Sequence, residues 1–102
     1  MNIKENLENE IDTITISVIG EVDGSNVKDL EFALKSALEK ATNLVIDLAQ
    51  LEYVSSAGLR VFLLIRKMTE IVGQSMVIRN VTEDVMEIFT VTGFVNLLTI
   101  ET

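Results

Sequence analysis

Polar and apolar residues alternate in one segment near the start of the chain. Within residues 13–19 the apolar residues Ile14, Ile16 and Val18 follow polar ones in turn, which is the pattern of a β-strand with one buried face. A weaker candidate strand covers residues 3–7, and Asn9 and Glu10 suit a turn between the two. The pattern therefore predicts two strands before any helix.

Three later segments have apolar residues at the three- and four-residue spacing of amphipathic helices. The first covers residues 27–41 and follows turn residues at 20–25, where Asp23, Ser25 or Asn26 could cap it. The second covers residues 57–72, and its wide apolar side indicates burial, with part of it open to a docking role. The third follows Asn80 and Glu83, which have capping-box spacing, and ends near Gly93.

Short apolar runs at residues 43–48, 75–79 and 95–100 predict three more strands. The run at 43–48 is nearly continuous, as in a central strand buried on both faces. The predicted order is β-β-α-β-α-β-α-β, which favours the α/β class, with one mixed β-sheet covered mainly on one face by helices. The 102 residues suit a single domain.

The charge balance narrows the classes of partner. Eight Lys and Arg residues against sixteen Asp and Glu give a net charge of −8. A protein that binds nucleic acid through phosphates needs a basic face, and an anionic membrane surface repels an acidic domain. We therefore expect no nucleic acid and no membrane, but a protein partner with a neutral or basic docking face.

The chain contains no cysteine and no histidine. Disulfides, thiolate sites, the usual zinc ligands and a Ser-His-Asp arrangement are thereby excluded. A carboxylate metal site stays open in principle, but no calcium-loop pattern is present, and we expect no metal and no cofactor. The first residues do not have the pattern of a signal peptide, and the apolar runs are far shorter than a membrane span, so we expect a soluble, cytoplasmic protein.

Two adjacent serines, Ser55 and Ser56, lie between the strand at 43–48 and the helix at 57–72. A serine at a helix start is usually a cap, but it can also accept a phosphoryl group, whose negative charge the helix N-terminus tolerates. The two roles are compatible. A third interpretation, an enzyme with a serine nucleophile, lacks support, because no activating base, Gly-x-Ser-x-Gly elbow or phosphate-binding loop is recognisable.

Four short patterns occur at the spacing found in STAS domains: Gly20-Glu21-Val22-Asp23, Val45-Ile46-Asp47-Leu48, Val54-Ser55-Ser56-Ala57-Gly58-Leu59 and Asn80-Val81. Over nearly its whole length the chain resembles this family, and in particular the stand-alone bacterial anti-sigma factor antagonists. The serine block is the specific part of the match. The resemblance implies one STAS domain over residues 1–102 that acts without being an enzyme.

The resemblance further implies a partner switch. In that family an anti-sigma factor that is also a serine kinase phosphorylates the antagonist. The unphosphorylated antagonist binds this kinase and frees the sigma factor, the phosphorylated form does not bind, and a PP2C-type phosphatase restores the first state. The alternative is a STAS scaffold or ligand-binding module in another signalling assembly, with no sigma-factor role.

Alignment of the serine block through Gly58 and Leu59 places the phosphorylated residue at Ser56, with Ser55 as second choice. Ser55 stands where the family usually has aspartate, and Ala57 replaces a second hydroxyl residue. The expected partner-binding residues are Glu21, Asp23, Ser55, Ser56, Ala57, Gly58, Leu59 and Arg60. Structural roles are open for several of them: packing for Gly58, the core for Leu59, and turn formation for Asp23. For Asp47 we expect loop hydrogen bonds rather than chemistry.

Overall fold

The computed structural model describes residues 1–101. Its elements are, in order, β1 (Asn2–Glu8), the 3-10 turn η1 (Asn9–Ile11), β2 (Thr13–Val22), α1 (Val27–Lys40), β3 (Asn43–Asp47), β4 (Leu51–Val54), α2 (Ser56–Val72), β5 (Ser75–Arg79), α3 (Glu83–Thr92), the 3-10 turn η2 (Phe94–Asn96) and β6 (Ile100–Glu101).

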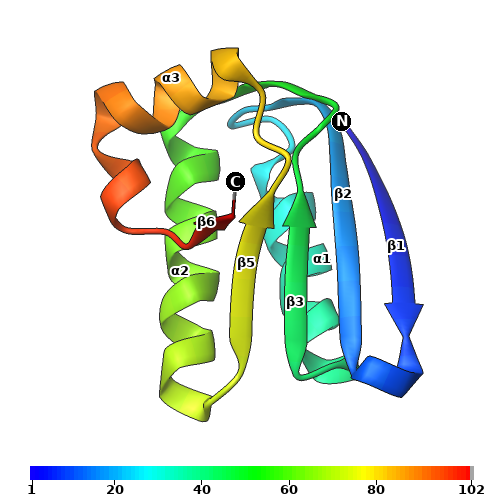
Figure 1. Cartoon of the computed structure of the whole chain (residues 1–102). Helices are drawn as coiled ribbons and strands as arrows, with labels where there is room; N and C mark the ends of the chain where they lie inside the picture. Colours follow the sequence, from blue (N-terminus) through cyan, green and yellow to red (C-terminus); the bar gives the residue numbers. More distant parts are fainter. Residues whose placement is uncertain (102) are drawn as a thin grey trace.

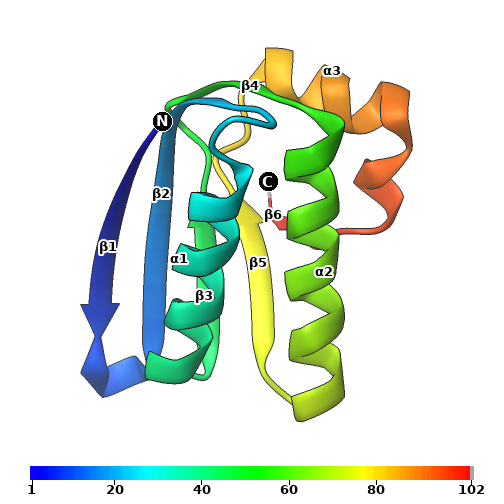
Figure 2. The same cartoon turned by 180° about the vertical axis from the view of Figure 1, so that it is seen from behind.

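Within residues 1–101 the strands form one six-stranded mixed sheet in the order β1-β2-β3-β5-β6, and β4 pairs with β2. β1 is antiparallel to β2, and the other pairings are parallel. Helices α1 and α2 lie side by side over one face of the sheet, and both begin at the edge where the parallel strands end (Figures 1 and 2). The predicted class, a mixed sheet with helices mainly on one face, is confirmed.

The core lies between this face and the two helices. The alternation along β2 buries Ile14, Ile16 and Val18 completely, while the residues between them are half-buried on the open face. The fully buried side chains that pack against them from α1 and α2 are Leu30, Leu34, Leu59, Phe62 and Ile65. Burying each large apolar side chain stabilises the fold by about 1.5–3 kcal/mol, so this packing holds α2 in place against the sheet.

Two features of the strand prediction were wrong. β4 was not predicted, because it has only four residues and its buried positions, Leu51 and Val54, are separated by two exposed residues, which is not the every-second-residue pattern of a strand. The predicted strand at 95–100 begins instead with the last two residues of the turn η2, which follows Gly93 in the left-handed conformation (φ +81°), and residues 97–99 are irregular. In the described part of the chain, only Ile100 and Glu101 of that segment pair with β5.

The predicted capping box of α3 was also wrong. Thr82 is the N-cap, and its hydroxyl oxygen accepts a hydrogen bond from the backbone N–H of Val85 at 3.4 Å. Asn80 instead adopts a left-handed conformation, with φ of 60°. Its side-chain amide donates a hydrogen bond to the Asp47 carboxylate at 3.2 Å, so it joins the loops that follow β3 and β5.

Candidate functional site

The two serines of the predicted site occupy different positions at the start of α2. Ser55 is the N-cap: its Oγ accepts a hydrogen bond from the Gly58 N–H at 3.4 Å, and its carbonyl accepts one from the Leu59 N–H at 3.0 Å. Ser56 is the first helical residue and is exposed. Within residues 1–101 its hydroxyl has no hydrogen-bond partner. The capping oxygen and the accessible hydroxyl therefore belong to different residues.

The loop between β2 and α1 lies directly beside this turn. The Ser55 N–H donates a hydrogen bond to the Val22 carbonyl at 2.8 Å, and Val22 pairs with Val54 in the β2–β4 ladder. Glu21 pairs with Tyr53 in the same ladder. The structure thus brings Glu21 and Asp23 next to the serines, although more than thirty residues separate them in sequence.

Hydrogen bonds hold the Glu21–Asn26 loop in a defined shape. One Asp23 carboxylate oxygen accepts bonds from the Ser25 N–H at 2.8 Å and the Ser25 hydroxyl at 2.5 Å. The Asn26 side chain accepts from the Asp23 N–H and donates to the Glu21 carbonyl, both at 3.0 Å. The Ser25 hydroxyl, followed by the Ser25 N–H, holds the pKa of Asp23 below its ordinary value of 3.8. Asp23 is therefore ionised and shapes the loop, which is the turn role that the sequence had left open.

Gly58 lies where the first turn of α2 meets the ends of β2 and β4. A Cβ atom added there would be 2.6 Å from Val54 Cγ2 and 2.8 Å from Val22 Cγ1, which is closer than real Cβ contacts. Glycine is therefore needed for the close packing of the helix against these strands. The packing interpretation of Gly58 is the one that this geometry supports.

The remaining predicted site residues differ in exposure. Leu59 is fully buried, so its side chain offers no surface to a partner, and the docking expectation is corrected for this residue to a core role. Ala57 is half-buried and Arg60 is exposed. The accessible part of the predicted site therefore consists of Glu21, Asp23, Ser56, Ala57 and Arg60, together with the half-buried cap Ser55.

Sequence reasoning missed the two exposed residues of β4, Glu52 and Tyr53, which precede the serine turn. Tyr53 is 46% exposed and lies opposite Glu21. Exposed aromatic residues are enriched in protein–protein interfaces, so this side chain extends the candidate docking surface. A single aromatic residue in an unrecognised strand gave no signal for this role.

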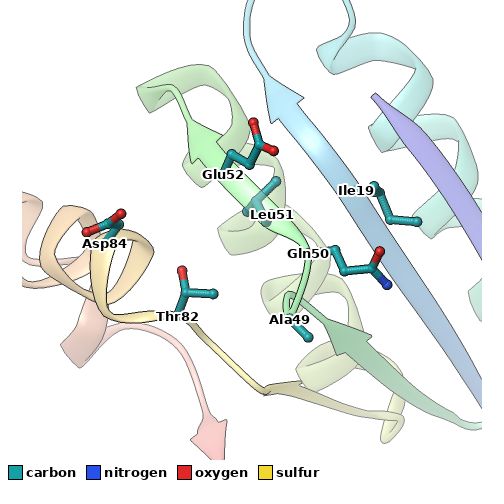
Figure 3. Close-up of a pocket in the computed structure, with 7 residues that line it drawn as sticks. All are labelled: Ile19, Ala49, Gln50, Leu51, Glu52, Thr82 and Asp84. Carbon is teal, nitrogen blue, oxygen red and sulfur yellow. The ribbon is translucent and has the colours of Figure 1, made fainter.

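Asp47 fixes the loop between β3 and β4. Its carboxylate accepts hydrogen bonds from the Ala49 N–H at 2.9 Å and the Asn80 amide at 3.2 Å, as expected for a loop-fixing residue. A shallow pocket lies beside this loop (Figure 3), lined by Ile19, Ala49, Gln50, Leu51, Glu52, Thr82 and Asp84. Its only charged lining residues are acidic, which does not suit an anionic ligand.

Residues 1–101 contain no group of three or more Asp and Glu side chains placed to hold a metal ion. In the same part of the chain, no helix combines the length and the apolar character that crossing a bilayer requires.

The sequence of this chain matches a known protein family. The sequence model of the STAS domain matches residues 4–102, so the chain belongs to the STAS domain family. It is 36% identical over 90 residues to the protein named "Putative anti-sigma factor antagonist BtrV" of Bordetella bronchiseptica, covering 86% of this chain and 78% of that protein. It is 29% identical over 100 residues to the anti-sigma-B factor antagonist of Bacillus subtilis, covering 98% and 92% respectively.

Solved structures show the same fold. The unphosphorylated form of the anti-sigma factor antagonist SpoIIAA superposes with a TM-score of 0.80 at 18% identity, over 99% of this chain and 89% of that one. The phosphorylated form of SpoIIAA, a Bacillus cell fate determinant, superposes with a TM-score of 0.73 at 17% identity, over 99% and 92%. The α/β arrangement described above is therefore the STAS fold.

Proposed function

We propose that this chain is an anti-sigma factor antagonist that works by partner switching, with Ser56 as its phosphorylated residue. The unphosphorylated protein binds an anti-sigma factor that is also a serine kinase, and this binding releases the sigma factor. The kinase then transfers the γ-phosphoryl group of ATP to Ser56 Oγ, with ADP leaving and the hydroxyl proton passing to a base of the kinase. Phosphorylation ends the binding.

The observation that carries this proposal is the exposed hydroxyl of Ser56 at the first position of α2. The cap is made by Ser55, so Ser56 can be modified without loss of the hydrogen bond that begins the helix. The added phosphate carries about −1.5 to −2 charges at the positive end of the helix, where it is tolerated. The fold therefore survives the modification, while the surface presented to a partner changes sharply.

The names of similar proteins support the same function. The two relatives are named as anti-sigma factor antagonists. SpoIIAA, which shares the fold, is described in both an unphosphorylated and a phosphorylated form. A PP2C-type phosphatase would return phosphorylated Ser56 to the free hydroxyl by hydrolysis, with inorganic phosphate as the second product.

The docking surface that we propose surrounds Ser56. Glu21 at the end of β2 and Asp23 in the loop after it contribute negative charge, Tyr53 contributes an aromatic face, and Ala57 leaves the backbone of the first turn open to close approach. A partner with a neutral or basic groove complements this surface. In this account the chain is a regulatory domain without an enzymatic activity of its own.

Mass spectrometry after incubation with ATP and candidate anti-sigma factor kinases tests this function. We expect one phosphate on wild-type protein, mapped to Ser56, and none on Ser56→Ala. Ser55→Ala is the matched control and should still gain one phosphate. Phosphate on Ser55 alone would move the switch to the capping residue. No phosphate from any active kinase would favour a STAS scaffold in another signalling assembly.

A further inference from the structure

Ser56 and Arg60 lie four residues apart on the exposed side of α2. Residues at this spacing are neighbours on a helix surface, with Cβ atoms about 5–6 Å apart. An arginine side chain is long enough to bring its guanidinium group to a phosphate at the earlier position. The helix thus carries a cation beside the residue that we propose to be phosphorylated.

Ion pairs at this spacing already form elsewhere in the protein. On α1, Glu31 and Lys35 pair at 2.8 Å, with the acid four residues before the base. On α2 itself, Arg66 and Glu70 pair at 2.7 Å. The first of these pairs has the same order, anion before cation, that a phosphorylated Ser56 and Arg60 would have.

Arg60 has no ion-pair partner among residues 1–101, whereas the other two arginines are both paired: Arg66 with Glu70 and Arg79 with Glu101. A guanidinium group without a carboxylate partner is free to bind a new anion. Its planar arrangement of N–H donors matches the oxygens of a phosphate and allows two parallel hydrogen bonds.

Among the charges near the turn, Arg60 is the cation that lies on the same helix as Ser56, one turn away. The end of β2, the loop after it and β4 contribute Glu21, Asp23 and Glu52 respectively, all acidic. Among residues 1–101, Lys28 in the first turn of α1 and the N-terminal ammonium group, which acts on the Asp23 carboxylate, are further cations at this end. A phosphate on Ser56 would be repelled by the carboxylates, so an arginine on the same helix has a specific role in holding it.

We propose that Arg60 binds the phosphate of phosphorylated Ser56 as an intramolecular ion pair. The physiological role of this pair rests on the proposed function, since it needs Ser56 to be the modified residue. In the unphosphorylated protein Arg60 is free to contact the partner. After phosphorylation it turns to the phosphate, so that one modification both adds charge and withdraws a cation from the docking surface.

The test uses the full chain with phosphoserine incorporated genetically at position 56, so that no kinase is needed. Melting temperatures are measured with and without the phosphate in wild type and in Arg60→Gln. Lys28→Gln and Lys67→Gln are the matched controls, because each removes one cation from an exposed helix position. We expect the phosphate to raise the melting temperature in wild type by about 2–4 °C more than in Arg60→Gln.

The two control variants should instead respond to the phosphate as wild type does. The difference in response between wild type and Arg60→Gln should be smaller in 1 M salt, where the Debye length is only about 3 Å. A direct readout is the NMR signal of the Arg60 Nε–H, which should shift on phosphorylation in the wild-type protein. An equal response of Arg60→Gln and wild type, or an effect of Lys28→Gln as large as that of Arg60→Gln, would overturn the pair. Because the phosphate is encoded, these outcomes are separate from failure of a kinase to modify Ser56.

Discussion

The backbone N–H of Ser55 donates a 2.8 Å hydrogen bond to the carbonyl oxygen of Val22. This bond extends the ladder in which Val22 and Val54 are paired. It holds the cap of α2 against the strand end that leads into the Glu21–Asn26 loop. Because backbone atoms make this contact, the serine turn and the loop are positioned together whatever happens to the Ser56 side chain. A phosphate on Ser56 is therefore expected to act locally, on the surface, and not by rearranging the fold.

The packing of Gly58 gives a first prediction. Gly58→Ala places a Cβ atom 2.6 Å from Val54 Cγ2 and 2.8 Å from Val22 Cγ1, and valine side chains are too stiff to move away cheaply. We expect the free energy of unfolding to fall by about 1–3 kcal/mol in chemical denaturation.

Gly24→Ala is the control for this variant, since nothing lies within 4 Å of an added Cβ there. Its free energy of unfolding should change by less than about 0.5 kcal/mol. Gly58→Ala should lower the free energy of unfolding less when it is introduced into the Val22→Ala variant than when it is introduced into the wild-type protein. If Gly58→Ala were as stable as wild type, the close approach of α2 to the strands would be refuted.

The separate positions of the two serines give a second prediction. Ser55→Ala removes the oxygen that accepts the Gly58 N–H and should lower the free energy of unfolding by about 0.5–1 kcal/mol. Ser56→Ala removes a hydroxyl without a partner in the described chain and should cost less than about 0.5 kcal/mol. Urea denaturation of the two variants in parallel measures the difference. A larger loss from Ser56→Ala would reassign the cap.

The Asp23 loop gives a prediction for pH dependence. The pKa of Asp23 is lowered in the folded protein, chiefly by the Ser25 hydroxyl. The ionised carboxylate therefore contributes stability that is fully present above its ordinary value of 3.8 and is lost as the pH falls through the lower folded value. NMR titration of the carboxyl group should show this lowered pKa. In Ser25→Ala the pKa should rise toward the ordinary value, and an unchanged pKa would contradict the assigned cause.

The bond between Asp47 and Asn80 gives a fourth prediction. Asn80 has a φ of 60° and donates to Asp47, so Asn80→Ala loses the hydrogen bond and strains the backbone. We expect its free energy of unfolding to fall by about 1–2 kcal/mol. Asn80→Gly loses the bond but adopts this conformation freely, and it should lose less. Equal losses in thermal denaturation would show that backbone strain has no part in the effect.

Much of the fold could be predicted because it depends on local patterns. The helix predicted at residues 57–72 is α2, Ser56–Val72, and the alternation at 13–19 lies within β2, Thr13–Val22. The last strand and β4 could not be predicted in this way. Each makes only two or three residue pairs, and such short pairings are decided by neighbouring strands rather than by local sequence.

The local structure around the candidate site was predictable only in part. The resemblance placed Ser55 and Ser56 at a helix start, yet it could not say which one caps the helix. That depends on the extended backbone of Ser55 and its bond to Val22, a contact between residues distant in sequence. Leu59 was expected to be a docking or core residue, and only the packing of α2 on the sheet shows that it is buried.

The most direct test of the central claim is the affinity of an anti-sigma factor kinase for two forms of this protein. One form is unmodified, and the other carries encoded phosphoserine at position 56; both are titrated by calorimetry at the same salt concentration. A charge placed in a surface shaped for a neutral hydroxyl costs several kcal/mol, so we predict that the phosphate weakens binding by about 100-fold or more. Equal affinity of the two forms would contradict the switch.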